Sequence, residues 1–502
     1  MADPLTVRRI GAALLAATGL AALTGCGEPA GPEPVETAAS APAGDWAGPL
    51  EFDRPERIVV LMMDTLRADV VGAYGSTAGL TPNIDAFAEQ AVVFEHAYAT
   101  SSWTRPVVAS MFTSRYPSSH TVLNKEDALP AEAQTLVEIL EADADTWSFG
   151  ITTNANISTA VGFGQSFDRW GPLPDARRRR YPEDRIGLVP ADEVAGATLE
   201  LLAGNEAAAA ARTFGFVQFI DPHAPYYPNH ALHPVEPPPE GDYQGSRTDI
   251  DRMLDAGREA RTERNVQWLR WLYDGEVAYL DRAFGEFIAA LKERGLYEDA
   301  LIIVVSDHGE QFFEHGQFEH GKSLYDVEAR VPFMIRFPGM PGAHTRRIER
   351  PVSVVDLAPT VLDAMDLPIP DEFEGRSLIP FIETGTRDER LDYVFSELAM
   401  FKAYSEAALR HDRYKMRVRY WHNRSGANSV DIELFDVIAD PGETNNLALD
   451  EGHRDAYRDL LAELSRWEAD VSEWSLGAGR EVDLDSLDEE TRKELRGLGY
   501  IQ

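Results

Sequence analysis

Short apolar segments recur along the chain and alternate with segments of helical periodicity. The apolar segments are continuous, as in strands that are buried on both faces of a sheet. Strands that alternate with helices predict an α/β fold, with a large mixed, mostly parallel central sheet and helices on both of its faces. The expected strands are residues 58–63, 214–220, 301–305 and 332–335, and the expected helices are residues 84–92, 131–140, 194–202 and 277–291.

The pattern changes near Arg390. Three later apolar segments are short or alternate with polar residues, which is typical of antiparallel strands, and a helix is expected over Arg454–Trp467. We therefore place a main domain at residues 56–389 and a smaller C-terminal α+β subdomain at residues 390–502. The last stretch, 483–502, is charged and is expected to fray. The three expected strands are residues 393–395, 414–418 and 432–435.

The N-terminus has the arrangement of an export signal. Two arginines precede an apolar segment, Ile10–Leu23, that is too short for a comfortable transmembrane helix. The sequence Leu23-Thr24-Gly25-Cys26 then resembles the lipobox of bacterial lipoproteins. We predict that residues 1–25 are a signal peptide, and that the protein is exported to the bacterial cell envelope and anchored to a membrane by lipid on Cys26. The alternatives are an ordinary secretory signal and a cytosolic protein with an apolar N-terminus.

Composition identifies a linker and narrows the possible partners. Residues 26–55 are rich in Pro, Ala, Gly and Glu without apolar periodicity, which predicts a flexible tether. The chain has 84 acidic and 47 basic residues, a formal charge of -37. Such a surface repels nucleic acid phosphates, so DNA and RNA are not expected as partners. Cys26 is the single cysteine, so the chain cannot form an internal disulfide.

Three of the expected strands are followed by polar residues. Asp64 follows the first strand, Asp221-Pro222-His223 the second and Asp307-His308 the third. Open α/β sheets bind ligands beyond the carboxyl ends of their strands, and carboxylate oxygens with an imidazole suit a divalent cation. Each of these polar residues alone is also common as a cap or a turn. Together they form an incomplete ligand set that needs at least one more member.

Thr104 is the candidate for that further ligand. Pro106 suits the first turn of a helix that continues through Val107–Thr113, so Thr104 lies at or just before a helix N-terminus. In the simplest interpretation Thr104 only caps the helix. In the functional interpretation the helix N-terminus stabilises an alkoxide and the anion that it attacks, and a metal ion activates the hydroxyl further.

Sequence blocks between residues 57 and 450 resemble the signature blocks of the sulfatase family, a branch of the alkaline phosphatase superfamily. The blocks occur in the order that is found in that family. They are Met63–Asp69, Thr81–Asp85, Thr104–Pro117, Asp221–Tyr226, Ser306–Glu310, His320–Tyr325, Arg330–Pro332, Val354–Thr360, Arg413–Lys415 and Glu433–Leu447.

The resemblance implies a hydrolase of ester bonds with one divalent metal ion, either Ca, Mn, Mg or Zn. Asp64, Asp307 and His308 are its implied ligands, and Thr104 completes the site. The implied substrate is an anionic ester of a small molecule, a glycan or a lipid headgroup. The implied catalytic residues are Thr104, His223 and His320, and the implied substrate-binding residues are Arg105, Lys322 and Asn154. Whether His320 or Lys322 contacts the leaving oxygen stays open.

The chain departs from the sulfatase pattern at the nucleophile. Sulfatases carry Cys, or sometimes Ser, where this chain has Thr104, and oxidation of that residue gives formylglycine. Thr cannot yield this aldehyde because its Cβ carries a methyl group, so no formylglycine is expected. Val108 stands where the motif has Arg, and Thr65 stands where many sulfatases have a second ligand Asp.

A threonine nucleophile on a single metal resembles instead the phosphoglycerol and phosphoethanolamine transferases of the same superfamily. A phosphothreonine can be released by water or an alcohol, whereas a sulfated threonine lacks the easy exit of a formylglycine adduct. We therefore expect hydrolysis of phosphoesters, phosphodiesters above all, or phosphoryl transfer. The alternatives are sulfate ester hydrolysis without formylglycine and an inactive lipid-anchored binding protein.

Overall fold

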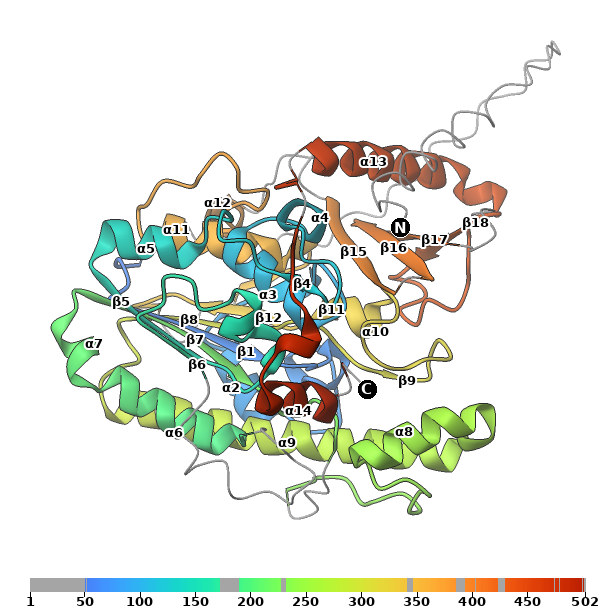
Figure 1. The fold of residues 1–502 in the computed structure, drawn as a ribbon, viewed down its shortest axis with the longest axis horizontal. Helices are drawn as coiled ribbons and strands as arrows, with labels where there is room; N and C mark the ends of the chain where they lie inside the picture. Colours follow the sequence, from blue (N-terminus) through green and yellow to red (C-terminus); the bar gives the residue numbers. More distant parts are fainter. Residues whose placement is uncertain are drawn as a thin grey trace, which may run out of the picture.

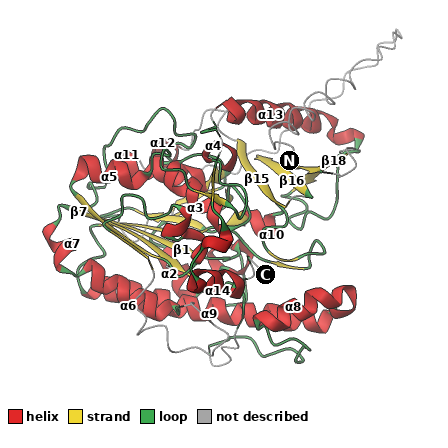
Figure 2. Cartoon of the chain, viewed as in Figure 1, coloured by secondary structure: helices red, strands yellow, loops and turns green. Residues whose placement is uncertain are grey.

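An eight-stranded sheet runs through the centre of the molecule, and helices cover both of its faces (Figures 1 and 2). The structure is a computed structural model. It describes residues 50, 52–171, 189–226, 232–340, 346–384, 393–401, 403–422, 429–473, 475–477, 479–498 and 500. The signal peptide, the lipidated Cys26 and almost all of the tether that the sequence predicts lie outside these residues. In the described residues, no helix has the length and apolarity to cross a membrane.

The central sheet is mostly parallel. Its order is β13-β2-β12-β8-β1-β7-β5-β6. Only β12 runs antiparallel to its neighbours, β2 and β8, and the remaining pairs are parallel. In sheet order the strands are Arg346–Ile348, Val92–Phe94, Phe333–Arg336, Ala300–Ser306, Arg57–Met63, Arg212–Phe219, Thr146–Ile151 and Arg169–Gly171.

Two hydrophobic cores explain why the strands have continuous apolar sequences. On β1, Ile58, Val60 and Met62 face one core, and Val59, Leu61 and Met63 face the other. A strand that is buried on both faces has no position for a polar side chain facing water. The first core is covered by α3 (Thr104–Thr113), α5 (Leu136–Ala144), α11 (Leu357–Ala364) and α12 (Ile379–Thr384), and the second by α2 (Pro82–Ala88), α6 (Ala191–Leu202) and α9 (Glu263–Glu293).

The C-terminal subdomain is a four-stranded antiparallel sheet with one helix packed on it. The helix α13 (Arg454–Glu473) places Trp467 in a stack on Phe395, with ring centroids 4.6 Å apart. This confirms the fold class that the sequence predicts, although one strand, β16, was not expected. The strands are β15 (Tyr393–Phe401), β16 (Tyr404–His411), β17 (Tyr414–Trp421) and β18 (Ser429–Asp436).

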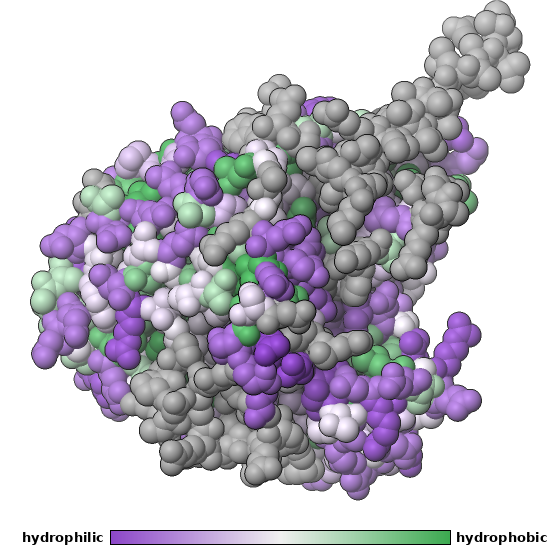
Figure 3. Space-filling view, in the orientation of Figure 1, coloured by the Kyte–Doolittle hydropathy of each residue, from purple (hydrophilic) through white to green (hydrophobic). Residues whose placement is uncertain are grey.

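The end of the chain returns to the main domain. The short strand β19 (Arg480–Glu481) pairs with β4 (Asp127–Ala128), and the helix α14 (Glu489–Gly497) follows. This differs from the expected fraying. Although the stretch is charged, Leu495, Leu498 and Tyr500 are buried in a common apolar cluster. Hydrophilic side chains gather where α14 lies on the visible surface (Figure 3), so the helix shows its charged side to water.

The remaining short elements connect these parts. The helices are α4 (Pro117–His120), α7 (Asn205–Ala209), α8 (Arg247–Ala256) and α10 (Asp326–Ala329), and the strands are β3 (Ala97–Tyr98), β9 (Gln311–Phe312), β10 (Phe318–Glu319), β11 (Arg330–Val331) and β14 (Val352–Ser353).

Candidate active site

The register of the sheet brings the predicted metal ligands together. Met63 at the end of β1 is paired with Ser306 at the end of β8, in parallel. The next residues, Asp64 and Asp307, therefore leave the sheet side by side at its carboxyl edge. Asp64, Asp307 and His308 are completely buried and offer ligand atoms that all lie within 4.8 Å of one another. The convergence that the sequence predicts is thus present.

One oxygen of each carboxylate is held by protein donors. Asp64 Oδ2 accepts hydrogen bonds from Gln218 Nε2 at 2.6 Å and from Asn154 Nδ2 at 3.1 Å. Asp307 Oδ1 accepts from the backbone N–H of Thr65 at 3.2 Å and from that of His308 at 3.0 Å. These bonds fix both carboxylates in orientation and leave the second oxygen of each for another partner.

The second oxygens point toward the same space as the histidine. Asp64 Oδ1 and Asp307 Oδ2 are buried and have no hydrogen-bond partner among the described residues. They lie 3.9 and 3.4 Å from His308 Nε2. Since His308 Nδ1 lies 2.9 Å from the carbonyl oxygen of Gly309, the tautomer with its proton on Nδ1 donates there and leaves the Nε2 lone pair free. Three unshared lone pairs therefore converge.

This donor set fits a divalent cation. Burial first, and then the negative charge of Asp307, raise the pKa of Asp64 well above its ordinary value, because two carboxylates are held close together away from water. A cation bound among the free lone pairs would compensate both charges and satisfy both oxygens. Carboxylate oxygens with one imidazole suit several divalent metals, so the geometry does not select among Ca, Mn, Mg and Zn.

Thr104 lies beside this cluster. It is the first residue of α3, and the preceding Trp103 provides no side-chain cap. Its Oγ1 is 3.3 Å from His308 Nε2, and the side chain is completely buried. The hydroxyl is therefore directed at the free lone pairs of the ligand set, at a helix N-terminus that favours negative charge.

Two further histidine rings, those of His320 and His223, lie near the ring of His308. The ring of His320 lies 4.3 Å from that of His308 and 4.9 Å from that of His223. Burial lowers the pKa of His223 to about 3 and that of His320 well below its ordinary value, so both rings are neutral. His223 Nε2 is buried without a partner among the described residues. His320 Nδ1 lies 3.0 Å from Glu310 Oε1, which orients the ring.

The side chains of the three predicted substrate-binding residues are hydrogen-bonded to other groups of the protein. Asn154 holds Asp64, as described, and its Oδ1 accepts from the N–H of Asn156. Arg105 is buried, and its guanidinium donates to Asn156 Oδ1 and to backbone carbonyls, among them those of Asn156 and Asp127. Lys322 Nζ donates to the carbonyl of Phe318 at 2.5 Å and lies 3.4 Å from Glu319 Oε2. These contacts occupy the cationic groups with protein acceptors.

Three residues in or beside the site were not predicted from the sequence. Gln218 orients Asp64, and it interrupts the apolar sequence from Phe214 to Phe219 in its strand, a signal that was available. Glu310 is buried between His320 and Tyr226, and burial raises its pKa to about 7. Tyr500 has its hydroxyl 3.0 Å from His320 Nε2, and the side chain of Thr104 is close enough to act on its pKa. Burial raises the pKa of Tyr500 well above its ordinary value.

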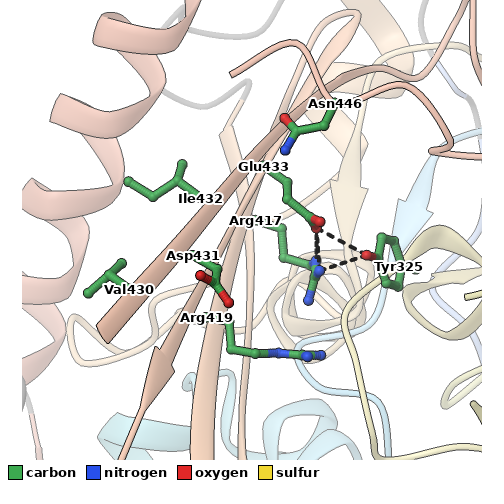
Figure 4. A pocket seen from close by; sticks show the side chains of 8 residues that line it. All are labelled: Tyr325, Arg417, Arg419, Val430, Asp431, Ile432, Glu433 and Asn446. Atoms are coloured by element: carbon green, nitrogen blue, oxygen red, sulfur yellow. Dashed lines mark hydrogen bonds and ion pairs between the residues drawn. The ribbon is translucent and has the colours of Figure 1, made fainter. Parts of the chain in front are cut away.

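A surface pocket lies elsewhere, on the C-terminal sheet (Figure 4). It is lined by Arg417, Arg419 and Glu433 of the sheet and by Tyr325. Both arginines are bound to carboxylates: Arg417 to Glu406 and Glu433, and Arg419 to Glu406. Because the positive charges of both arginines are already compensated, this pocket would attract an anionic ester less than a cation bound by the metal-ligand cluster of Asp64, Asp307 and His308 would.

The family follows from comparison with known proteins. Residues 56–367 match the family described as Sulfatase, and residues 313–470 match the family described as N-sulphoglucosamine sulphohydrolase, C-terminal. The protein belongs to the sulfatase family and is a hydrolase of ester bonds. Enzymes of this family use a divalent metal ion, which agrees with the buried Asp64, Asp307 and His308.

Known relatives cover most of the chain. An arylsulfatase of Clostridium perfringens is 24% identical in an alignment of 450 positions that covers 79% of this chain and 91% of the relative. The crystal structure of the phosphonate monoester hydrolase of Agrobacterium radiobacter is similar with a TM-score of 0.66 and 25% identity, over 83% of this chain and 96% of that one. A structure solved in complex with its substrate D-glucosamine-2-N,6-O-disulfate has a TM-score of 0.65 at 18% identity, over 84% and 99% of the two chains, and shows the shared fold.

Proposed function

We propose that the protein hydrolyses phosphoesters, phosphodiesters above all, or transfers their phosphoryl group, with Thr104 as a covalent nucleophile. The observation that carries the proposal is the position of Thr104 Oγ1, 3.3 Å from His308 Nε2 and beside the free oxygens of Asp64 and Asp307. A hydroxyl in this place is a nucleophile when it is ionised, and both a helix N-terminus and a neighbouring cation favour the ionised form.

Two arguments favour phosphorus over sulfur. Threonine cannot form the aldehyde through which sulfatases release sulfate, whereas a phosphothreonine is open to attack by water. In addition, the relative from Agrobacterium radiobacter is a phosphonate monoester hydrolase, so a similar chain acts on a phosphorus ester. No formylglycine is needed in this scheme.

In the proposed reaction, different residues of the chain carry out different steps. A bound divalent ion would supply positive charge for the anionic ester and for the ionised hydroxyl. Thr104 Oγ1 attacks phosphorus, the Oγ1–P bond forms, and the bond from phosphorus to the leaving oxygen breaks. We propose that a neutral imidazole takes the Thr104 proton and returns it to the leaving oxygen. His223, whose Nε2 has no hydrogen-bond partner among the described residues, is the first candidate and His320 the second. Water or an alcohol then attacks the phosphothreonine and restores the hydroxyl.

The test is a panel of chromogenic esters with the full chain and its Thr104 variants. We expect activity on bis-p-nitrophenyl phosphate or p-nitrophenyl phosphate that needs added Mn²⁺, Ca²⁺, Mg²⁺ or Zn²⁺. Thr104→Ala should lower kcat by several orders of magnitude, while Thr104→Ser keeps part of it because Ser retains a hydroxyl. Wild-type activity of Thr104→Ala would mean that water, and not Thr104, is the nucleophile.

Sulfate ester hydrolysis is the second candidate. The arylsulfatase of Clostridium perfringens is aligned over most of its length and favours it, as does a relative from Formosa agariphila, an ulvan-active sulfatase. The same panel includes p-nitrophenyl sulfate. Activity on this ester alone would support the second candidate and refute the first.

We also propose that the protein is exported and held at a membrane by lipid on Cys26, with its substrate a small ester, a glycan or a lipid headgroup. The support is the lipobox-like sequence Leu23-Thr24-Gly25-Cys26 after an apolar segment. Cys26→Ser should release the protein from the membrane fraction or leave its signal uncleaved. Normal processing together with unchanged membrane retention would contradict the anchor.

A further inference from the structure

The C-terminal segment, comprising α14, Leu498 and Tyr500, forms part of the wall of the active site. Its buried leucines share an apolar cluster with Trp103, the residue just before the nucleophile. Lys125 Nζ donates to the backbone carbonyl of Tyr500 at 2.5 Å, and Asp488 caps α14 by accepting from the N–H of Thr491. The segment, near the centre of Figure 1, is therefore fastened to the main domain at several points.

The hydroxyl of Tyr500 lies between the nucleophile and the catalytic histidines. It is 3.0 Å from His320 Nε2, and the side chain of Thr104 is close enough to act on its pKa. The tyrosine ring is 6.2 Å from the ring of His223 and 6.3 Å from that of Trp103. The side chain is 4% exposed. A phenol in this place does more than fill the apolar cluster, because its polar end faces the reacting group.

An ester in position for attack must bring its oxygens to the same place. Phosphorus has to lie about 3–3.5 Å from the attacking oxygen of Thr104, so its non-bridging oxygens lie within hydrogen-bond reach of the groups around that hydroxyl. The two cations expected to bind them, Arg105 and Lys322, donate instead to protein carbonyls. Tyr500 has a hydroxyl at this point that is fixed by its backbone and by its ring. The tautomer of His320 with its proton on Nε2 donates to this hydroxyl and leaves the phenolic proton for a phosphoryl oxygen.

We propose that Tyr500 is a substrate-binding residue, whose hydroxyl donates a hydrogen bond to a non-bridging oxygen of the phosphoryl group that Thr104 attacks. This rests on the proposed function. It assigns the end of the chain, from α14 onward, to the active site of the main domain. The opposite possibility is that the segment is a plug, which must withdraw before the substrate can enter.

The two possibilities predict opposite signs for the loss of the side chain. Tyr500→Phe keeps the ring and removes the hydroxyl, and Tyr500→Ala removes both. With p-nitrophenyl phosphate and bis-p-nitrophenyl phosphate as probes, we expect Tyr500→Phe to lower kcat/KM by about tenfold to a hundredfold, the effect of one hydrogen bond to a charged group. We also expect weaker competitive inhibition by inorganic phosphate, by a similar factor. Tyr500→Ala should be no more active than Tyr500→Phe.

Tyr420→Phe is the matched control. It removes one hydroxyl whose hydrogen bond, 2.9 Å to Glu468 Oε1, lies in the C-terminal subdomain. We expect kcat/KM and phosphate inhibition to stay at wild-type values in this variant. Melting temperatures of all three variants separate a fold defect from a binding defect, because a purely structural role of Tyr500 would lower the melting temperature without changing phosphate affinity per folded molecule.

The outcomes also separate this inference from the proposed function. If Thr104→Ala is inactive and Tyr500→Phe has wild-type kinetics, the inference is wrong and the proposed function stands. Higher activity of Tyr500→Ala would identify a plug and would likewise overturn the inference. If the wild type cleaves no phosphoester, the proposed function fails, and binding of inorganic phosphate by calorimetry still tests Tyr500: equal affinity of wild type and Tyr500→Phe contradicts its role.

Discussion

Two charged clusters in this molecule, one partly exposed and one completely buried, compensate the charge of their carboxylates in opposite ways. In the C-terminal sheet, Glu406 and Glu433 are bound by Arg417, and the protein itself supplies the positive charge. At the carboxyl edge of the central sheet, Asp64 and Asp307 face the imidazole of His308 and leave an oxygen each without a hydrogen bond among the described residues. Burying charge is costly unless it is compensated. The protein alone therefore compensates the carboxylate charges of the first cluster, whereas those of the second are compensated only when a cation binds.

Removal of a carboxylate from the metal-ligand cluster gives the largest expected effect. Asp307→Asn should lower kcat/KM by about a thousandfold or more, because it weakens the charge that holds the metal ion. The metal-free variant should be at least as stable as the metal-free wild type, since one of two like buried charges is gone. Kinetics and metal analysis check the loss of activity, and calorimetry after chelation checks the stability of the metal-free variant. Full activity, or a destabilised metal-free variant, would remove the distinction between the clusters.

The reverse pattern is expected in the C-terminal sheet. Arg417→Met leaves Glu406 and Glu433 with less compensation and should lower the free energy of unfolding by about 3–5 kcal/mol. The kcat/KM value per folded molecule should stay close to that of the wild type. Urea unfolding, with activity corrected for the folded fraction, measures this. A variant of wild-type stability with impaired catalysis would instead place Arg417 in the substrate site.

A smaller effect is expected when a residue that orients a ligand is changed. Gln218→Leu removes the donor to Asp64 Oδ2 and should weaken metal affinity by about tenfold to a hundredfold. The loss of activity should be recovered at high metal concentration, because all proposed ligands remain. A metal titration of the activity distinguishes this from Asp307→Asn, for which excess metal should restore little.

The smallest effect is expected at Glu374, a carboxyl that belongs to neither cluster. Burial raises the pKa of Glu374 to about 7, and its Oε2 accepts from the N–H of Tyr116, with Glu397 and Arg115 nearby. Since the folded state holds this proton more tightly, its contribution to stability is present below about pH 4.5 and is lost as the pH rises toward 7. The contribution is roughly 1–2 kcal/mol, less than the full pKa shift implies, because the side chain is partly exposed to water. Glu374→Gln should flatten the stability profile in this window, and an unchanged slope would contradict the prediction.

The sequence predicts those parts of the site that follow from local pattern. Asp64 and Asp307 could be placed because parallel strands end at one edge of a sheet, and their strands are recognisable as continuous apolar segments. β5 was not recognised, because Thr146, Ser148 and Gly150 interrupt its apolar sequence. The contact of Tyr500 with Thr104 depends on a return of the chain from a distant subdomain, and Arg105 is directed by backbone carbonyls in a loop. Tertiary structure decides both, so no local pattern predicts them.

The central claim is that Thr104 becomes covalently bonded to the substrate. The most direct measurement is mass spectrometry of the Thr104 peptide after the metal-loaded enzyme turns over bis-p-nitrophenyl phosphate and is quenched with acid. We expect one p-nitrophenyl-phosphoryl adduct on Thr104 in the wild type, since one nitrophenol leaves and the other stays on phosphorus, and none in Thr104→Ala. Turnover of the phosphodiester with an unmodified Thr104 peptide under every quench time would contradict the account.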